Sequence, residues 1–371
     1  MNKYSLQIAL AYISVVIGGG FASGNEVIQF FTGYGLAGIA GSVVAAILFA
    51  FLGMQIARVS SVMQAGSHKQ VLYIMFGEKA GFVVDVILSF FLYGVGVVML
   101  AGAGAALEQQ FGWPLRAGSA LMTVLVIGTL CLNVKGIINL ISAVMPFLLV
   151  MVLAITVYSI YASTATPDEL RVAAEEASVV TLIKDEWEVP HWTLSALLYA
   201  SFNIAVGFPM LAVIGGLTKQ PRAAALGGIA GGLGLGFLII LLNIGMYANL
   251  DRLLGLPIPT LQLADEIHPW LAILMTLSLI CMIYSTAVGM FFAFGARFAA
   301  PATNRFKILS AVFAVIGLGL SQVGFDELIN KVYPMLGVVG LVLIIAIAMS
   351  WIRTRNRSAE ELAADPRVQQ K

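Results

Sequence analysis

Apolar residues in this chain gather in long stretches, and most charged residues fall between them. A helix that crosses a bilayer needs about 20 mainly apolar residues, and the chain has ten stretches on this scale. They cover residues 5–34, 36–61, 79–108, 115–133, 137–162, 192–217, 222–248, 269–298, 306–322 and 327–352. The pattern predicts an all-α polytopic membrane protein with ten transmembrane helices.

The composition predicts a membrane environment, and the charges in the loops predict an orientation in the membrane. With 60% hydrophobic and 11% charged residues, the chain is far more apolar than a soluble domain, so we expect membrane lipid around it and no nucleic-acid partner. Most of the 20 lysines and arginines fall in alternate loops, which predicts a plasma-membrane protein with both termini in the cytoplasm. The histidines and cysteines have no metal-binding spacing, so no resident cofactor is expected.

A long acidic loop divides the ten segments into two groups of five. Because five is odd, the second group must enter the membrane from the side opposite to the first, and matching segments start at a nearly constant offset. This is the signature of an inverted repeat. The predicted parts are a first repeat at 1–162, an extracellular loop at 163–190, an inverted second repeat at 191–353 and a basic cytoplasmic tail at 354–371.

Two of the segments are poor helices at matching depth. The first contains three consecutive glycines from Gly18 and a fourth at Gly24, and the sixth contains Asn203, Gly207 and Pro209. Glycine and proline both disfavour a helix interior, and interrupted segments at corresponding positions of two repeats indicate a transport site near the membrane midplane. We therefore expect helices 1 and 6 to be discontinuous. Close packing of helices on the glycines and an ordinary proline kink are the alternatives.

The sequence from Gly18 to Phe31, GGGFASGNEVIQFF, resembles the opening of the YkvI-type bacterial membrane proteins. The arrangement of segments over residues 4–353 resembles the LeuT-type five-plus-five transporters of the amino acid, polyamine and organocation superfamily. In that fold, segments 1 and 6 unwind around the substrate and segments 3 and 8 line it. The substrate-binding residues that the breaks and the resemblance imply are Gly18, Gly19, Gly20, Phe21, Ala22, Ser23, Tyr93, Phe202, Asn203, Val206 and Gly207.

The resemblance also implies a sodium site between segments 1 and 8. Ser285 and Thr286 are adjacent hydroxyls on segment 8, and oxygen ligands suit an alkali cation. The implied ligands, from side chains and carbonyls, are Ser14, Ile17, Met282, Ser285 and Thr286. The alternative is that the two hydroxyls hydrogen-bond to carbonyls of their own helix.

Two carboxylates, Glu26 and Asp85, lie within predicted spans. A charge at the bilayer centre costs about 2.5–3.5 kcal/mol, so such residues are functional candidates. Glu26 follows the first break on its outer side and is a candidate for gating, for attraction of a cationic substrate or for carrying a proton. Asp85 lies near the inner end of segment 3, where pairing with a base from a loop is the alternative.

These features together predict a secondary active transporter, not an enzyme, that moves a small organic solute by alternating access. Broken helix ends offer N–H groups to a carboxylate and carbonyls to an ammonium group or a cation, so the solute is expected to be an amine or an amino acid. Sodium is the expected coupling ion. A proton-coupled transporter and a non-transporting ligand sensor remain as alternatives. The sequence does not predict an oligomeric state.

Overall fold

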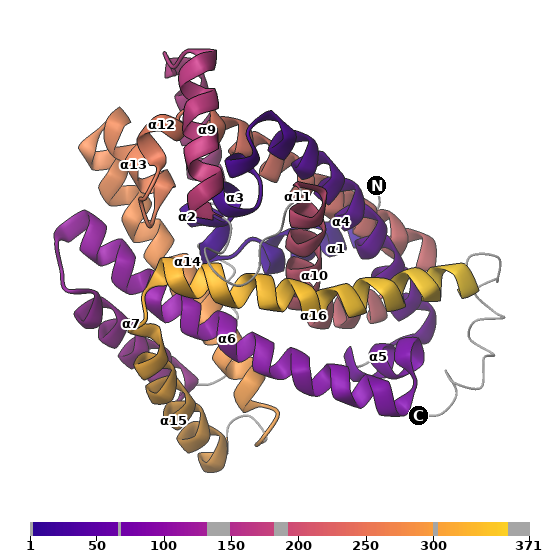
Figure 1. Cartoon of the computed structure of the whole chain (residues 1–371). Helices are drawn as coiled ribbons and strands as arrows, with labels where there is room; N and C mark the ends of the chain where they lie inside the picture. The colour runs from indigo at the N-terminus through magenta and orange to yellow at the C-terminus, as the bar shows by residue number, and fades with distance from the viewer. Residues whose placement is uncertain (1–2, 66–67, 132–148, 182–191, 300–302, 355–371) are drawn as a thin grey trace.

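The structure is a computed structural model that describes residues 3–65, 68–131, 149–181, 192–299 and 303–354. All regular elements in these ranges are helices (Figure 1). The helices are α1 (Lys3–Val16), α2 (Gly19–Ser23), α3 (Asn25–Phe30), η1 (Thr32–Tyr34), α4 (Leu36–Met63), α5 (His68–Phe76), α6 (Glu78–Phe111), α7 (Leu115–Leu130), α9 (Pro167–Thr181), α10 (Trp192–Gly216), α11 (Pro221–Tyr247), α12 (Leu250–Leu253), α13 (Pro259–Ile267), α14 (Pro269–Gly295), α15 (Asn304–Ser321) and α16 (Phe325–Thr354).

The helices lie where the apolar stretches predict them. Within the described residues, seven helices are long and apolar enough to cross a membrane, and three shorter apolar helices occupy Lys3–Val16, Leu115–Leu130 and Leu149–Ala162. The all-α polytopic class is confirmed, whereas the count of ten crossings stays a prediction. The start of the fifth predicted segment and nearly all of the predicted basic tail lie outside the described residues.

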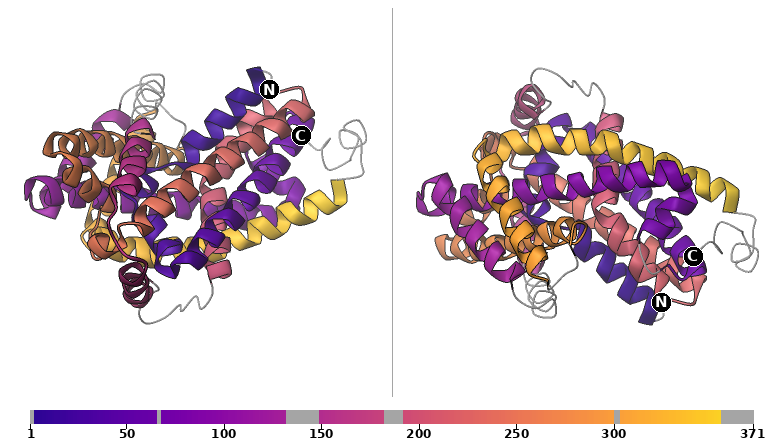
Figure 2. Two further views of the ribbon diagram at one scale, coloured as in Figure 1. Left: turned by 90° about the horizontal axis from the view of Figure 1, so that it is seen from above. Right: turned by 90° about the horizontal axis from the view of Figure 1, so that it is seen from below.

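The helices form two groups that each draw on both predicted repeats. In one group α1, α4, α10 and α11 pack on one another, and in the other α6, α7, α14 and α15 do so. In both views of Figure 2 the beginning of α1 lies toward one end of the molecule, and the purple turn from α6 into α7 lies at the other end. Helices at equivalent positions of the two repeats therefore pack in the same group, as a LeuT-like 5+5 inverted repeat requires.

Small residues set the contact between α4 and α11. A Cβ atom on Gly53 would lie 2.9 Å from the carbonyl oxygen of Gly228, and Cβ atoms on Gly228 and Gly232 would overlap the backbone of α4. The glycine stripe of α11 therefore lets two backbones touch, as small residues do in membrane bundles.

The two predicted breaks have different outcomes. The first crossing is interrupted after Val16 and again at Gly24, whose φ of 81° lies in the left-handed region that favours glycine. The predicted break in the sixth crossing is wrong, because α10 runs continuously from Trp192 to Gly216. Pro209 removes only one N–H donor, and Asn203 bonds back to the Tyr199 carbonyl of its own helix at 3.0 Å, so the segment stays helical.

Candidate functional site

The interruption of the first crossing lies where four crossings meet. A Cβ atom on Gly207 of α10 would lie 3.0 Å from Val16 at the end of α1, and one on Gly18 would lie 3.7 Å from Thr286 of α14. A Cβ atom on Gly19 would be 3.0 Å from the sulfur of Met99 on α6. Segments 1, 3, 6 and 8 therefore converge at this point.

Backbone carbonyls at the end of α1 are left without helical partners. The Ile17 N–H donates to the Ile13 carbonyl at 2.9 Å and is the last such bond of the helix. Among the described residues, no backbone N–H is bonded to the carbonyls of residues 14–17. Because an unpaired carbonyl in a membrane interior costs free energy, these oxygens are suited to a bound cation or ammonium group.

Residues between the two interruptions are buried and partly satisfied by local bonds. The Ser23 hydroxyl donates to the Gly20 carbonyl at 2.7 Å and accepts from the Asn25 N–H at 3.2 Å, so it stabilises the turn at Gly24. Phe21 is 4% exposed and Ala22 is fully buried. The predicted substrate contacts of these residues stay predictions.

Glu26 on α3 points back toward the break. A Cβ atom on Gly20 would overlap its carboxylate, so the absence of a side chain there makes the room that Glu26 occupies. The Tyr333 hydroxyl hydrogen-bonds to Glu26. Glu26 is 4% exposed, and no basic side chain of the described residues lies within 4 Å of it. The Tyr333 partner was not predicted, since nothing in the sequence connects the last crossing to the first.

An aromatic cluster surrounds this carboxylate. Phe202 stacks on Tyr333 with ring centroids 4.5 Å apart and on Phe30 at 6.4 Å, and Tyr199 packs against Phe202 at 6.0 Å. Phe202 is 3% exposed. The structure thus brings Phe202 close to Glu26 through their shared neighbour Tyr333, and the buried Val206 lies one turn further along α10.

The structure places Tyr93 away from the break, and its predicted substrate contact stays a prediction. Its hydroxyl donates to the Phe313 carbonyl on α15 at 3.0 Å, and its ring packs on Phe294 with centroids 4.9 Å apart. The residue of α6 that does reach the break is Met99, six residues or about 1.7 turns further along the helix. Tyr93 consequently packs against α14 and α15.

The candidate sodium ligands are partly brought together. Thr286 contacts the start of α2 through Gly18, whereas Ser285 donates to the Met282 carbonyl at 2.8 Å, which is the helix back-bond that the alternative interpretation predicts. The donor atoms at this point are hydroxyl and carbonyl oxygens, the ligand type of an alkali cation. The side chain of Ser14 is exposed, so only its unpaired carbonyl remains as a ligand.

Asp85 belongs to a separate cluster near the end of α14. Its carboxylate is 1% exposed and lies 2.7 Å from Arg297 Nη2, 3.1 Å from His68 Nε2 and 3.7 Å from Lys69 Nζ. These bases come from α5 and from the residues just after α14, so Asp85 is paired as the alternative interpretation predicts, and its role in gating or coupling stays a prediction. Asp85 ties α5 and α14 to α6.

Helix α13 packs on the interrupted segment of the first crossing. Thr260 on this helix donates to the Ala22 carbonyl at 2.7 Å, and Ile258 exchanges two hydrogen bonds of 3.1 Å with Gln109 on α6. No sequence signal predicted the role of Thr260.

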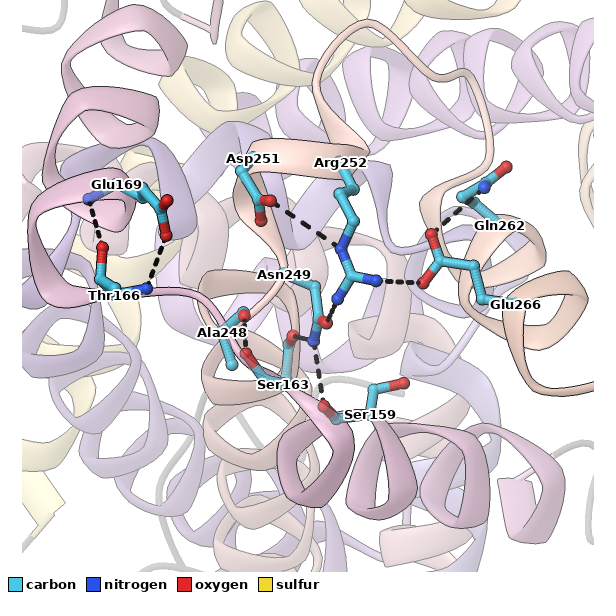
Figure 3. A network of polar contacts seen from close by, with 11 residues as sticks. Ser159, Ser163, Thr166, Glu169, Ala248, Asn249, Asp251, Arg252, Gln262 and Glu266 are labelled. Carbon is cyan, nitrogen blue, oxygen red and sulfur yellow. Dashed lines mark hydrogen bonds and ion pairs between the residues drawn. The ribbon is translucent and has the colours of Figure 1, made fainter.

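A polar network then fastens α13 to its neighbours (Figure 3). Arg252 pairs with Glu266 of α13 at 2.9 Å and also donates to Asn249, which bonds to the Ser159 carbonyl at 3.3 Å. Helix α13 is therefore held in place by contacts with several other elements.

Solved structures of the same fold are membrane transporters. The chain matches MhsT in complex with L-phenylalanine with a TM-score of 0.63 at 18% identity, over 96% of this chain and 94% of that one. A manganese transporter of Eremococcus coleocola matches with a TM-score of 0.62 at 14% identity, over 97% and 89% of the two chains. Mhp1 in its inward-facing conformation matches with a TM-score of 0.61 at 16% identity, over 96% and 79%. These matches define the structural class: the chain has the LeuT fold.

Within this class, the chain is homologous to two membrane proteins of Bacillus subtilis (strain 168). It is 27% identical to YkvI over 350 residues, which cover 92% of this chain and 94% of that protein. It is 25% identical to YyaD over 340 residues, or 92% and 95% of the two chains. The family model described as branched-chain amino acid transport protein matches residues 264–365.

Proposed function

We propose that this protein is a secondary active transporter that moves a small amino acid or amine by alternating access. The observation that carries the proposal is the set of unpaired carbonyls at residues 14–17, which lie beside α10 and α14 in the interior of the bundle. The match of the C-terminal third to a branched-chain amino acid transport family supports an amino acid with an apolar side chain. Its placement in a plasma membrane with both termini in the cytoplasm belongs to the same proposal.

The residues around the break have different roles in the proposed binding. Unpaired carbonyls accept hydrogen bonds from an ammonium group, and the buried aromatic cluster around Phe202 excludes water from the outer side. Glu26 lies between the two and adds a negative charge or a proton-binding oxygen beside the cargo. Opening of the outer face requires α13 to part from the break, because Thr260 is bonded to Ala22.

Sodium is the proposed coupling ion. The oxygen donors beside the start of α2 suit it, and the residues that would hold it are Thr286 and Ser285 through their hydroxyls and Ser14, Ile17 and Met282 through their carbonyls. When bound, the ion supplies positive charge that offsets the partial charges of these oxygens. A proton is the second candidate, favoured by Glu26, because a buried carboxyl group without a basic neighbour is suited to gain and lose a proton.

The test combines binding and transport. The purified protein is screened by thermal shift with leucine, isoleucine, valine and phenylalanine and their decarboxylated amines, in sodium or in choline chloride, and any hit is assayed for uptake in proteoliposomes. Uptake that saturates and requires an inward sodium gradient supports the proposal. Binding without uptake identifies a sensor, and uptake driven by a pH gradient in choline, lost in Glu26→Gln, identifies proton coupling.

A matched pair of variants tests the sodium site. Thr286→Val removes a hydroxyl at constant size, and we expect the half-saturating sodium concentration to rise about tenfold, which corresponds to about 1.4 kcal/mol. Ser278→Ala is the control, because this hydroxyl is on the same helix but donates to the Leu274 carbonyl at 2.7 Å. Equal effects of the two variants would remove Thr286 from the site.

A further inference from the structure

Three bases surround one buried acid where α5, the beginning of α6 and the end of α14 meet. The acid, Asp85, is only 1% exposed. The bases are more exposed, with 18% for Arg297, 32% for His68 and 49% for Lys69. The carboxylate is therefore covered, and the three bases, which we call the basic rim, lie between it and the surroundings. Helix α5 lies beside the beginning of α6, at the end opposite to α7 (Figure 1).

The basic rim carries more positive charge than Asp85 neutralises. Burial lowers the pKa of His68 below its usual value, so at pH 7 the cluster holds the two positive charges of Lys69 and Arg297 against one negative charge. No other acidic side chain of the described residues lies within 4 Å of the three bases. Because the negative charge lies beneath the positive ones, the surface of the cluster attracts anions.

Lys69 and Arg297 have hydrogen-bond donors left for a ligand. Lys69 Nζ lies 3.7 Å from Asp85, which is beyond hydrogen-bond distance, and no acceptor among the described residues bonds to it. Arg297 comes closest to Asp85 through Nη2, and no hydrogen bond joins its Nε or Nη1 to a described residue. An ammonium group and a guanidinium group with free donors are well suited to bind phosphate oxygens.

Exposed phenylalanines continue from the basic rim along α6 and α14. Phe298 directly follows Arg297 and is 43% exposed, and Phe90 on α6 is 61% exposed. Both rings pack on Phe294, with centroids 5.1 and 5.8 Å away, so the three rings form one apolar surface that joins the two helices. Exposed apolar surface of this kind on a membrane protein is suited to contact lipid chains.

We propose that the basic rim binds the phosphate of an anionic phospholipid whose acyl chains lie against Phe298 and Phe90. Basic clusters at the membrane surface are the type of site that holds acidic lipid head groups. A zwitterionic choline lipid would bring its own positive charge to the rim, and a free phosphate ion would make no use of the aromatic surface. An anionic phospholipid matches both features.

This site is separate from the proposed transport site. At 1.5 Å per residue, about 21 Å along the axis of α6 separate Asp85 from Met99, the residue of this helix that reaches the break. A bound phosphate would bridge Lys69 of α5 to Arg297 after α14 and strengthen the connection that Asp85 makes. Lipid binding needs a membrane but no transport, so the two proposals can fail independently.

The test measures lipid binding to the purified full chain, stripped of lipid in detergent and transferred to ammonium acetate at pH 7. Native mass spectrometry gives the dissociation constant of the probe, dioleoylphosphatidylglycerol, with dioleoylphosphatidylcholine for comparison. Glycerol 3-phosphate serves as a competitor that carries the phosphate without acyl chains.

Four variants separate the parts of the site. Lys69→Gln removes an exposed base and leaves the base nearest to Asp85 in place, Arg297→Lys keeps the charge but removes the forked donors, and Phe298→Ser removes an exposed ring. Lys79→Gln is the matched control, because it removes the same charge from an exposed lysine in the first turn of α6 that has no ion pair among the described residues. Melting temperatures without lipid check that each variant is folded.

We expect the dissociation constant of the phosphatidylglycerol to rise at least fivefold in Lys69→Gln and in Arg297→Lys and at least threefold in Phe298→Ser, with less than a twofold change in Lys79→Gln. The phosphatidylcholine should bind at least tenfold more weakly, and excess glycerol 3-phosphate should leave most of the bound lipid in place. Absence of binding, equal losses in Lys69→Gln and Lys79→Gln, equal binding of the two lipids, or displacement by glycerol 3-phosphate, which would assign the rim to a soluble anion, would each overturn the proposal. A protein that binds the lipid at the rim but fails to transport in liposomes would refute the proposed function and leave this site intact.

Discussion

Replacement of Arg297 by glutamine should expose how much the buried carboxylate of Asp85 depends on this base. Asp85 is 1% exposed and Arg297 approaches it to 2.7 Å, so the variant removes the nearest charge from a desolvated carboxylate. Loss of one partner of a buried ion pair costs about 3–5 kcal/mol. His68 and Lys69 remain at 3.1 and 3.7 Å, but they are 32% and 49% exposed and compensate in part. We therefore expect the free energy of unfolding to fall by about 3 kcal/mol.

The assay is a denaturant titration of the detergent-solubilised protein, followed by tryptophan fluorescence, for Arg297→Gln, Asp85→Asn and the double variant. If the cost comes from the unpaired carboxylate, the double variant should be more stable than Arg297→Gln alone, because asparagine carries no charge to leave unpaired. Arg305→Gln is the control, since Arg305 is exposed and has no ion pair in the described residues. A double variant as unstable as Arg297→Gln would refute this reasoning and assign the loss to packing of the arginine.

Three further predictions address other parts of the molecule. Gly20→Ala should displace the Glu26 carboxylate and lower stability by about 1–3 kcal/mol, and it should abolish uptake, which a transport assay with an expression control would check. Burial lowers the pKa of His68 below 6.5, so the unfolded chain binds more protons there and stability should fall as the pH drops below about 6.5; a pH series of melting temperatures should show a weaker dependence in His68→Gln. Gly228→Leu should prevent the close approach to Gly53 and give little folded protein in size-exclusion profiles, whereas a leucine at the unobstructed Gly289 should be tolerated.

The sequence predicted the helices and the first break well because both depend on local properties. Apolar length fixes a membrane crossing, and consecutive glycines weaken a helix wherever they occur. The second break was wrong because one proline can be accommodated when the surrounding helices hold the segment, and packing against α1, α4 and α16 is not visible in local sequence.

The candidate site was predicted in part for a similar reason. Gly18, Phe202 and Thr286 lie where the resemblance places them, because the order of crossings fixes which helices meet. Tyr93 bonds to α15 and Met99 lies at the break, and which residue of α6 reaches the break depends on the rotation of α6 about its axis. A uniformly apolar membrane helix carries little information about that rotation.

The backbone contact between α4 and α11 limits how the protein can change shape. The contact at Gly53 and Gly228 leaves no clearance for one helix to slide along the other, and Gly227 and Gly231 also bring α1 close to α11. These three helices must therefore travel as one rigid block. In the proposed transport cycle, movement is therefore expected between this block and the group that contains α6 and α14, which are linked to it through α10 and α16.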